Sequence, residues 1–133
     1  MGDVSEGAVY LSNSLYTGKT GYGVKSMLCT GAAWDSMLDF IKDSDHNVTS
    51  SNGWGNYTGK LSNTGATESK NIYDVAGNCD EWTTEAYVTD RRVVRGGSYA
   101  LHGSGSPASY RDESYPTING YGTSFRPLLY VAL

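Results

Sequence analysis

Apolar residues recur at helical spacing in a first stretch near the start of the chain. Val4, Ala8, Leu11 and Leu15 fall on one stripe, and Gly18 ends the run. Because a helix buries its apolar stripe against the rest of the protein, this spacing predicts a first helix that packs through these side chains.

A second stretch has the same period. Trp34, Met37, Leu38 and Ile41 stand at positions i, i+3, i+4 and i+7, which is the pattern of an amphipathic helix. We predict a second helix that starts at Thr30 and buries these four side chains.

Three shorter apolar runs predict strands. Val24–Leu28 connects the two helices, Arg92–Gly96 follows later, and Phe125–Val131 closes the chain. The middle run ends in Gly96-Gly97, where the backbone needs positive φ or a close approach. We expect the second and third runs to be core strands.

Between the second helix and Asn71 the chain turns polar. Residues 43–70 are rich in Ser, Thr and Gly, which is typical of a long surface loop. Trp54 and Tyr57 interrupt this stretch, and we expect both rings to hold the loop against the scaffold.

In composition the chain is acidic and rich in glycine and tyrosine. It has 133 residues, a formal net charge of −4, 17 glycines and 11 tyrosines. The length suits one domain, and the charge argues against nucleic acid or an anionic membrane as a partner. No apolar run reaches the length of a membrane span, so we expect no membrane insertion. Cys29 and Cys79 stand alone, and two buried free thiols are favoured over one disulfide.

Three motifs of the second half occur in a characteristic order. Residues 71–83 carry N-I-Y-D-x-x-G-N-x-x-E-W-T, residues 92–99 read R-V-V-R-G-G-S-Y, and residues 124–126 read S-F-R. Together they resemble the formylglycine-generating enzyme (sulfatase-modifying factor) family, which is built on a variant of the C-type lectin fold. The resemblance implies one α+β domain over residues 1–133, with two helices on a small twisted antiparallel sheet and many loops. We expect this domain to be the C-terminal part of a longer protein.

The same motifs supply scaffold residues. We expect Trp82 to fill the core beneath the Gly77-Asn78 turn. Arg95 and Arg126 should hydrogen-bond backbone or carboxylate groups and so hold irregular loops in place.

The chemistry of the catalytic family members is missing. In those enzymes a pair of cysteines after R-V-x-R-G-G-S binds copper and oxidises a substrate cysteine, whereas residues 99–107 contain no cysteine. Ser or Gly cannot replace a thiolate as a soft-metal ligand, so we expect no such enzyme activity. A diverged oxidoreductase that uses other groups, and a structural surface or tail module, are the alternatives.

A calcium site is implied at one turn of the motif. In the family, the G-N-x-x-E-W turn often holds structural calcium, which here places Asn78 and Glu81 as candidate ligands. The alternative is that Asn78 adopts a left-handed turn conformation and Glu81 pairs with Arg92 or Arg95. The two residues between Asn78 and Glu81, Cys79 and Asp80, depart from the family pattern. This departure favours the alternative without calcium, and we expect no cofactor.

The stretch from Tyr99 to Tyr121 has the composition of a binding loop. Tyr, Ser, Gly and Asn supply twelve of its 23 residues, four of them tyrosines. Tyrosine gives a large amphipathic contact area at low entropic cost, and the small polar residues adapt their hydrogen bonds. An ordinary solvated loop would share the Ser and Gly but has no need of four tyrosines.

This pattern also resembles the variable proteins of diversity-generating retroelements, a second branch of the same fold family. There, adenine-directed mutagenesis of chosen codons diversifies a ligand-binding face that is displayed on a phage particle or a bacterial surface. Glu113 does not fit such a codon origin. The resemblance implies a non-catalytic, hypervariable face for a protein or cell-surface ligand, with these residues converging on it: Tyr99, Ala100, Leu101, His102, Asp112, Ser114, Tyr115, Ile118, Asn119 and Tyr121.

Overall fold

The computed structural model describes residues 4–16, 23–118, 120 and 122–131. Its first element is the helix α1 (Val4–Ser14). Ala8 and Ser12 are buried, whereas Leu11 and Leu15 are 50% and 45% exposed. The predicted helix is confirmed, but its predicted buried stripe is wrong at both leucines. The neighbouring strand decides the face, because Ser26 Oγ donates to the carbonyl of Ser12 at 2.5 Å.

The second helix, α2 (Gly31–Ile41), follows the sequence prediction closely. Thr30 is its N-cap and accepts a hydrogen bond from the backbone N–H of Ala33 at 3.0 Å, which satisfies one of the free donors of the first turn. Trp34, Leu38 and Ile41 are buried, whereas Met37, the fourth residue of the predicted stripe, is half-buried. Their spacing places three large side chains on one side of the helix.

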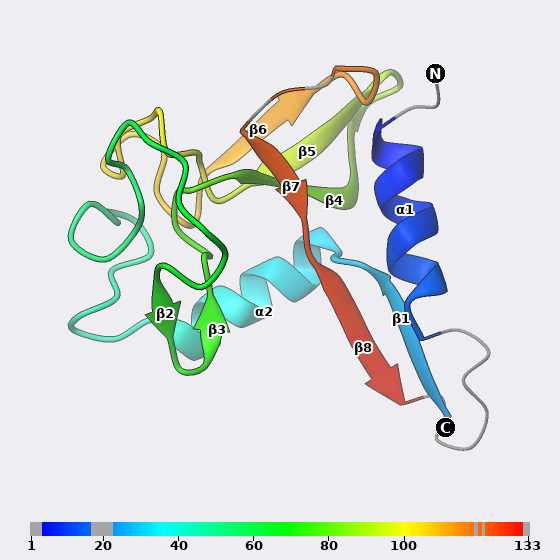
Figure 1. The fold of residues 1–133 in the computed structure, drawn as a ribbon, viewed down its shortest axis with the longest axis horizontal. Helices are drawn as coiled ribbons and strands as arrows, with labels where there is room; N and C mark the ends of the chain where they lie inside the picture. Colours follow the sequence, from blue (N-terminus) through cyan, green and yellow to red (C-terminus); the bar gives the residue numbers. More distant parts are fainter. Residues whose placement is uncertain (1–3, 17–22, 119, 121, 132–133) are drawn as a thin grey trace.

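The strands form one central sheet and two small pairs (Figure 1). The four-stranded sheet has the order β6-β5-β4-β7, while β1 pairs with β8 and β2 with β3. The bounds are β1 (Val24–Leu28), β2 (Glu68–Ser69), β3 (Ile72–Tyr73), β4 (Asp80–Val88), β5 (Arg91–Arg95), β6 (Arg111–Ser114), β7 (Thr123–Phe125) and β8 (Pro127–Val131).

The central sheet is mixed rather than purely antiparallel. β4 and β5 are antiparallel, as are β5 and β6, but β7 runs parallel to β4. The sequence-based expectation of an antiparallel sheet is therefore wrong at β7. A parallel neighbour needs a long crossover, and the stretch between β4 and β7 contains β5, β6 and the tyrosine-rich loops.

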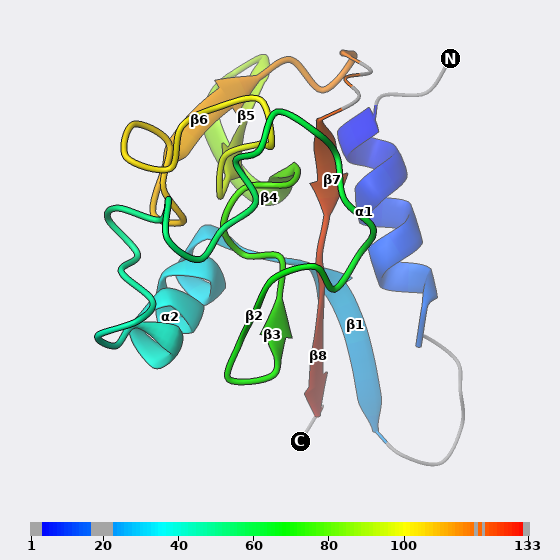
Figure 2. The same ribbon diagram turned by 60° about the vertical axis from the view of Figure 1, so that its left-hand side comes forward.

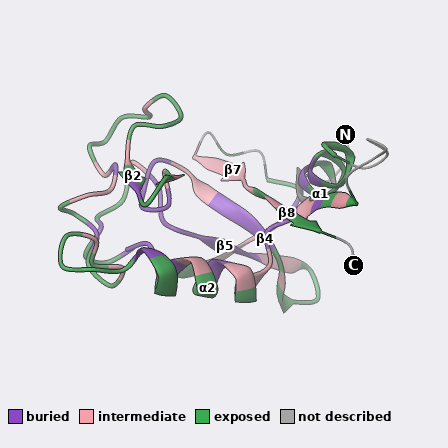
Figure 3. Ribbon diagram, turned by 90° about the horizontal axis from the view of Figure 1, so that it is seen from below, coloured by how far each residue is buried: buried purple, intermediate pink, exposed green. Residues whose placement is uncertain are grey.

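The two helices pack on opposite faces of this sheet (Figures 2 and 3). Successive side chains of a strand point to opposite faces. Val94 therefore packs with Ala8 of α1, whereas the Arg95 guanidinium donates to Asp35 of α2 at 2.6 Å. β5 is thus a core strand, as predicted.

The last apolar run does not form one core strand. It breaks at Arg126 into β7, which pairs with β4, and β8, which pairs with β1. β8 is mostly exposed. The prediction of a single core strand over residues 125–131 is wrong, because the chain changes from one sheet to another at this point.

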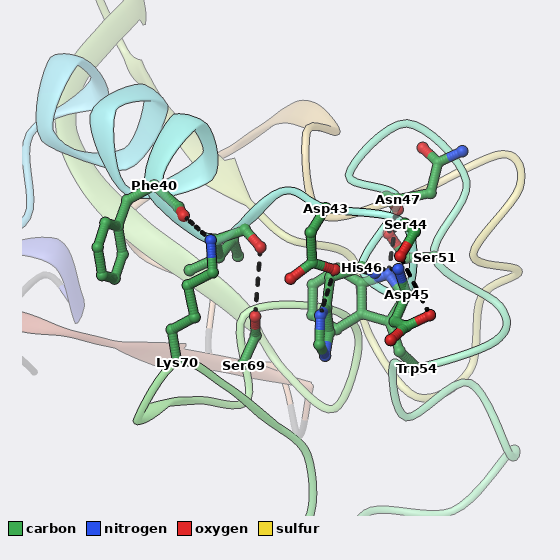
Figure 4. A network of polar contacts seen from close by, with 11 residues as sticks. Phe40, Asp43, Ser44, Asp45, His46, Asn47, Ser51, Trp54, Ser69 and Lys70 are labelled. Carbon is green, nitrogen blue, oxygen red and sulfur yellow. Dashed lines mark hydrogen bonds and ion pairs between the residues drawn. The ribbon is translucent and has the colours of Figure 1, made fainter.

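The polar stretch after α2 is a loop held by the two predicted aromatic residues. Trp54 Nε1 donates to the carbonyl of Asn47 at 3.1 Å, and Tyr57 Oη donates to the carbonyl of Ser106 at 2.9 Å. Figure 4 shows the start of the loop, where His46 Nδ1 lies 2.9 Å from Asp43 Oδ1. The loop closes with the β2–β3 hairpin, which also contacts the end of α2: Lys70 Nζ donates to the carbonyl of Phe40 at 2.6 Å.

Both cysteines are free thiols, as the sequence favours. Cys29 is buried, while Cys79 is only half-buried. Across the residues that the structure describes, no helix is long and apolar enough to cross a membrane.

Candidate functional site

Two glycines fix where the tyrosine-rich region leaves the sheet. Gly96 and Gly97 follow β5 with φ of 92° and 71°, a conformation that L side chains rarely adopt. A Cβ on Gly96 would lie 3.1 Å from the Trp34 ring, and one on Gly97 would collide with the carbonyl of Ser106. The glycines predicted from sequence are confirmed, and they start the candidate loop at a rigid point.

Tyr99 is half-buried next to the motif turn. Its backbone N–H donates to the carbonyl of Asn78 at 2.9 Å, and its own carbonyl accepts from Gly59 at 2.9 Å. Its ring lies against Gly122, where a Cβ would be 3.9 Å from Tyr99 Cε1. Two hydrogen bonds therefore hold the Tyr99 backbone, and its ring lies near Gly122.

Asp80 lies in the same region and was not singled out by sequence reasoning. Its backbone N–H donates to the carbonyl of Gly122 at 2.7 Å. Its Oδ1 is buried and has no hydrogen-bond partner among the described residues. Burial and the charge of Asp112 raise the pKa of Asp80 from 3.8 to about 7, against a hydrogen bond from Gly97 that lowers it. At neutral pH this carboxyl group can both donate and accept.

Tyr110 connects Asp80 with one of the predicted residues. Burial, followed by the nearby charges of Asp112 and Asp80, raises the pKa of Tyr110. Tyr110 thus has a side-chain hydrogen bond with Asp112, and the charge of Asp80 also acts on Tyr110. Tyr110 is one of the four tyrosines counted in residues 99–121, but no sequence pattern places it beside Asp80, because β4 and β6 come together only through the pairing of each with β5.

The next three predicted residues are exposed. Ala100, Leu101 and His102 lie on a turn that is fixed to the polar loop, since Gly103 N–H donates to Asn52 Oδ1 at 2.7 Å. The backbone of this turn is held, while the side chains are free to face solvent or a ligand.

Strand alternation divides the remaining predicted residues. Asp112 and Ser114 point to one face of β6, and Glu113 points to the other. Tyr115 joins Glu113, because Arg91 pairs with Glu113 and also donates to Tyr115 Oη at 2.7 Å. Tyr115 therefore lies apart from Asp112, and the structure does not bring all predicted residues onto one face.

The last predicted residues lie beyond β6. Ile118 is exposed, and its N–H donates to the carbonyl of Tyr115 at 3.0 Å. Asn119 and Tyr121 lie outside the described residues.

The candidate calcium ligands have protein partners. Asn78 has φ of 62°, and its Oδ1 accepts from Asn56 Nδ2 and Ser62 N–H, both at 2.9 Å. Both carboxylate oxygens of Glu81 accept from Arg126, at 2.7 and 2.8 Å. The partner is thus Arg126, not Arg92 or Arg95 as the sequence-based alternative held.

These side chains do not fit a calcium ion as they stand, because their oxygens are already hydrogen-bonded. No group of three or more His, Cys, Asp or Glu that could hold a metal occurs in the described part of the chain. Calcium at Asn78 and Glu81 therefore stays a prediction from resemblance.

Neither thiol is activated as a nucleophile. Burial, and then the charge of Glu81, raises the pKa of Cys29 to about 11, and the same two causes raise the pKa of Cys79. A thiol with a raised pKa is protonated at neutral pH and is a poor metal ligand and nucleophile. The arrangement around Asp80, Tyr99 and Tyr110 offers hydrogen-bonding and aromatic groups, which suits binding.

Comparison with known proteins gives a structural neighbour only. No family model matches the chain, and no curated protein matches its sequence. Variable protein 1 of Treponema denticola, a solved structure, is similar with a TM-score of 0.63 at 18% sequence identity, over 81% of this chain and 48% of that one. The two share a fold, a small α+β structure with two helices and curled sheets that is consistent with a C-type-lectin-like fold. This chain spans about half the length of the neighbour.

Proposed function

We propose that this chain is a ligand-binding domain with a diversified face, the variable protein of a diversity-generating retroelement. The observation that supports it most strongly is the shared fold with a protein named as a variable protein, over 81% of this chain. The finer assignment, a single C-type-lectin-like domain of the formylglycine-generating-enzyme type at the C-terminal end of a longer protein, belongs to the same proposal.

The centre of the proposed binding face consists of Asp80, Tyr99, Tyr110 and Asp112, and its outer part of Ala100–His102 and Ser114. Two half-buried tyrosines and a carboxyl group with a pKa near neutrality make a rigid, amphipathic centre. The exposed turn at Ala100–His102 can change without disturbing the core. Tyr115 and Ile118 extend this surface around the edge strand β6.

The partner is a protein or a cell-surface ligand, and the domain is displayed on a phage particle or a bacterial surface. The net charge of −4 gives nucleic acid no attraction. Affinity therefore has to come from the tyrosine anchors and from hydrogen bonds to the acidic centre.

The DNA that flanks the gene tests this proposal directly. We expect a near-repeat of the segment that encodes residues 99–121, differing mainly at adenines, beside a reverse-transcriptase gene. If neither is found, the diversification proposal is wrong, and a generic lectin-like binder is left.

The proposed role is binding rather than catalysis. Incubation of the protein with a C-x-P-x-R peptide, copper and oxygen should leave the peptide cysteine unmodified, as read by mass spectrometry. A peptide aldehyde would establish the diverged oxidoreductase instead.

A further inference from the structure

The first helix leaves most of its apolar stripe outside the core of its own domain. α1 buries two small side chains, Ala8 and Ser12, whereas Leu11, and Leu15 directly after its last residue, are about half exposed. The two leucines are four residues apart, so they lie on the same side of the helix. An amphipathic helix normally packs its large apolar side chains against a partner, and here the domain itself does not cover them.

β8 has the same imbalance. Leu128 packs against one of the two hydrophobic cores, whereas Leu129 and Val131 are 56% and 64% exposed. Neighbouring residues of a strand point to opposite faces. Leu129 and Val131 therefore share the face of β8 that Leu128 does not use.

The exposed side chains of α1 and β8 lie on one surface. Leu129 stands opposite Ser26 in the register of β8 with β1, and directly opposite residues of antiparallel strands point to the same face. Ser26 Oγ donates to the carbonyl of Ser12 at 2.5 Å and accepts from Tyr16 N–H at 3.2 Å. Leu129 is therefore on the α1 side of the strand pair, next to the turn that carries Leu15. We name this surface the α1–β8 patch, and its residues are Leu11, Leu15, Leu129 and Val131.

The α1–β8 patch lies away from the proposed binding face. In Figures 1 and 2, β8 is at one end of the molecule with the C-terminal end of α1 beside β1, and β6 is at the other end. A partner on the patch would therefore leave the binding face free.

The patch and its surroundings carry no charge. Residues 7–16 and 127–131 contain no Asp, Glu, Lys or Arg. A charged partner segment would lose its hydration there without gaining an ion pair. A lipid surface is equally unfavourable, because membrane-binding helices carry Lys or Arg beside their apolar face, whereas α1 has neither and the chain has a net charge of −4.

A second copy of the chain fits this surface. It brings the same uncharged apolar patch, so two acidic chains can meet here without opposing charges at the contact. A two-fold axis pairs a surface with itself and is the commonest symmetry of oligomers. α1 has 11 residues and β8 has five, so each element is about 16 Å long. A contact of this extent falls among small interfaces, below about 1,200 Å² in total, which form weak complexes.

We propose that two copies of this chain form a weak, two-fold symmetric dimer through the α1–β8 patch. Each copy buries the leucines of its first helix against the patch of the other copy. The dimer presents two binding faces, so a surface with repeated ligands is held more tightly than by a single copy.

Sedimentation equilibrium of the full chain from about 1 μM to 1 mM tests the proposal. We expect a monomer–dimer equilibrium with a Kd in the micromolar range. Leu15→Lys should weaken the dimer at least about tenfold, because symmetry buries two unpaired charges. Tyr10→Lys is the matched control, since it makes the same charge change at a 72% exposed position on another side of α1. It should leave the Kd unchanged.

A second variant covers the case in which Leu15→Lys does not fold, as read by circular dichroism. Leu129→Thr removes an apolar side chain of the patch and keeps a β-branched residue in the strand, and it should also weaken the dimer. A chain that stays monomeric at about 1 mM overturns the proposal, as does a dimer that tolerates both variants. A monomer that floats with phosphatidylcholine vesicles, and loses this binding in Leu15→Lys, would assign the patch to a membrane and overturn the proposal as well.

Discussion

Two neighbouring carboxylates in β4 differ in their hydrogen-bond partners, because adjacent residues of a strand lie in different surroundings. Asp80 and Glu81 point to opposite faces of the sheet. Glu81 is buried on a salt bridge with Arg126, whereas Asp80 has a buried oxygen without a partner in the described structure. The first is part of the scaffold. The second has the unsatisfied polar group that a binding site can use.

Asp80 should make stability depend on pH. Its pKa is about 7 in the folded protein against an ordinary 3.8, so the folded state holds its proton more tightly than the unfolded state. The stabilising effect of protonation is complete below pH 3.8 and is lost as the pH rises through 7. Asp80→Asn should therefore be more stable than the unaltered chain at pH 8, and this advantage should shrink toward pH 4.

Urea unfolding at several pH values measures the difference. Asp112→Asn is a second test variant. Removing the charge of Asp112 should lower the pKa of Asp80 and so shift the pH dependence of the unfolding free energy to lower pH. An Asp80→Asn advantage that is the same at pH 4 and pH 8 would contradict the assignment.

Trp82 is the largest side chain of the core on the α1 side. It is 1% exposed and packs with Ala8, Leu28 and Val94, which confirms the prediction that Trp82 fills the core. Trp82→Ala should lower the free energy of unfolding by about 3–5 kcal/mol through the cavity it leaves.

Thermal unfolding of two further variants shows whether the loss of stability is specific to the buried Trp82 side chain. Trp82→Phe should cost less, because the indole N–H it removes has no hydrogen-bond partner in the described structure. Tyr10→Ala, at an exposed position of α1, should change the free energy by no more than about 0.5 kcal/mol. Equal losses for Trp82→Ala and Tyr10→Ala would place Trp82 outside the core.

At the scale of elements, the junction between β7 and β8 joins the separate sheets. β7 belongs to the central sheet and β8 to the β1 pair, and Arg126 is the one residue between them. Its side chain holds Glu81 of β4 and the carbonyl of Tyr73 in β3. One arginine therefore connects the central sheet with both small sheets.

Removing this arginine should be costly. Arg126→Ala leaves Glu81 buried without its cation, which should lower the free energy of unfolding by about 3–5 kcal/mol. Arg92→Ala is the control, since the Arg92 side chain donates to the backbone carbonyls of Thr89 and Arg91 rather than to a carboxylate. Chemical denaturation of both variants compares them. Similar losses would show that Arg126 is not the connection we describe.

At the scale of the whole molecule, the central sheet with its two cores forms a rigid frame, and the loops between β5 and β7 can vary in sequence. Two cores, one on each side of the central sheet, hold the frame. The tyrosine-rich region starts at the glycine pair after β5 and returns at β7. A binding loop with fixed ends loses less entropy on binding, and its side chains can vary without unfolding the domain.

We therefore expect substitutions at different positions between β5 and β6 to have different effects on stability. The combined variant Ala100→Ser, Leu101→Ser, His102→Ser should change the free energy of unfolding by about 0.5 kcal/mol or less for each substitution. Gly97→Ala, a few residues earlier, should cost about 2 kcal/mol or more, because φ is 71° and the Cβ would meet the carbonyl of Ser106. Calorimetry of the two variants tests the contrast, and a costly triple variant would show that the turn belongs to the frame.

Elements with local signals can be predicted from the amino-acid sequence. The i, i+3, i+4, i+7 spacing from Trp34 to Ile41 set α2, and the Gly96-Gly97 pair marked the end of β5. The alternative prediction of a left-handed conformation at Asn78 is confirmed, because its φ is 62°. These features depend on backbone geometry and on spacing within a few residues, so the residues themselves carry the information.

The faces that these elements bury and the partners that they contact depend on the assembled fold. α1 has apolar residues around more than one side, and β1 selects the side with Ala8 and Ser12 rather than Leu11. Tyr115 and Asp112 are close in sequence but lie on opposite faces of β6, and the order of the strands brings Asp112 to Asp80. Such outcomes follow from contacts between residues far apart in the chain. The energies of these contacts cannot be inferred from any short window of sequence. Which faces are buried and which residues meet is therefore known only from the assembled sheets.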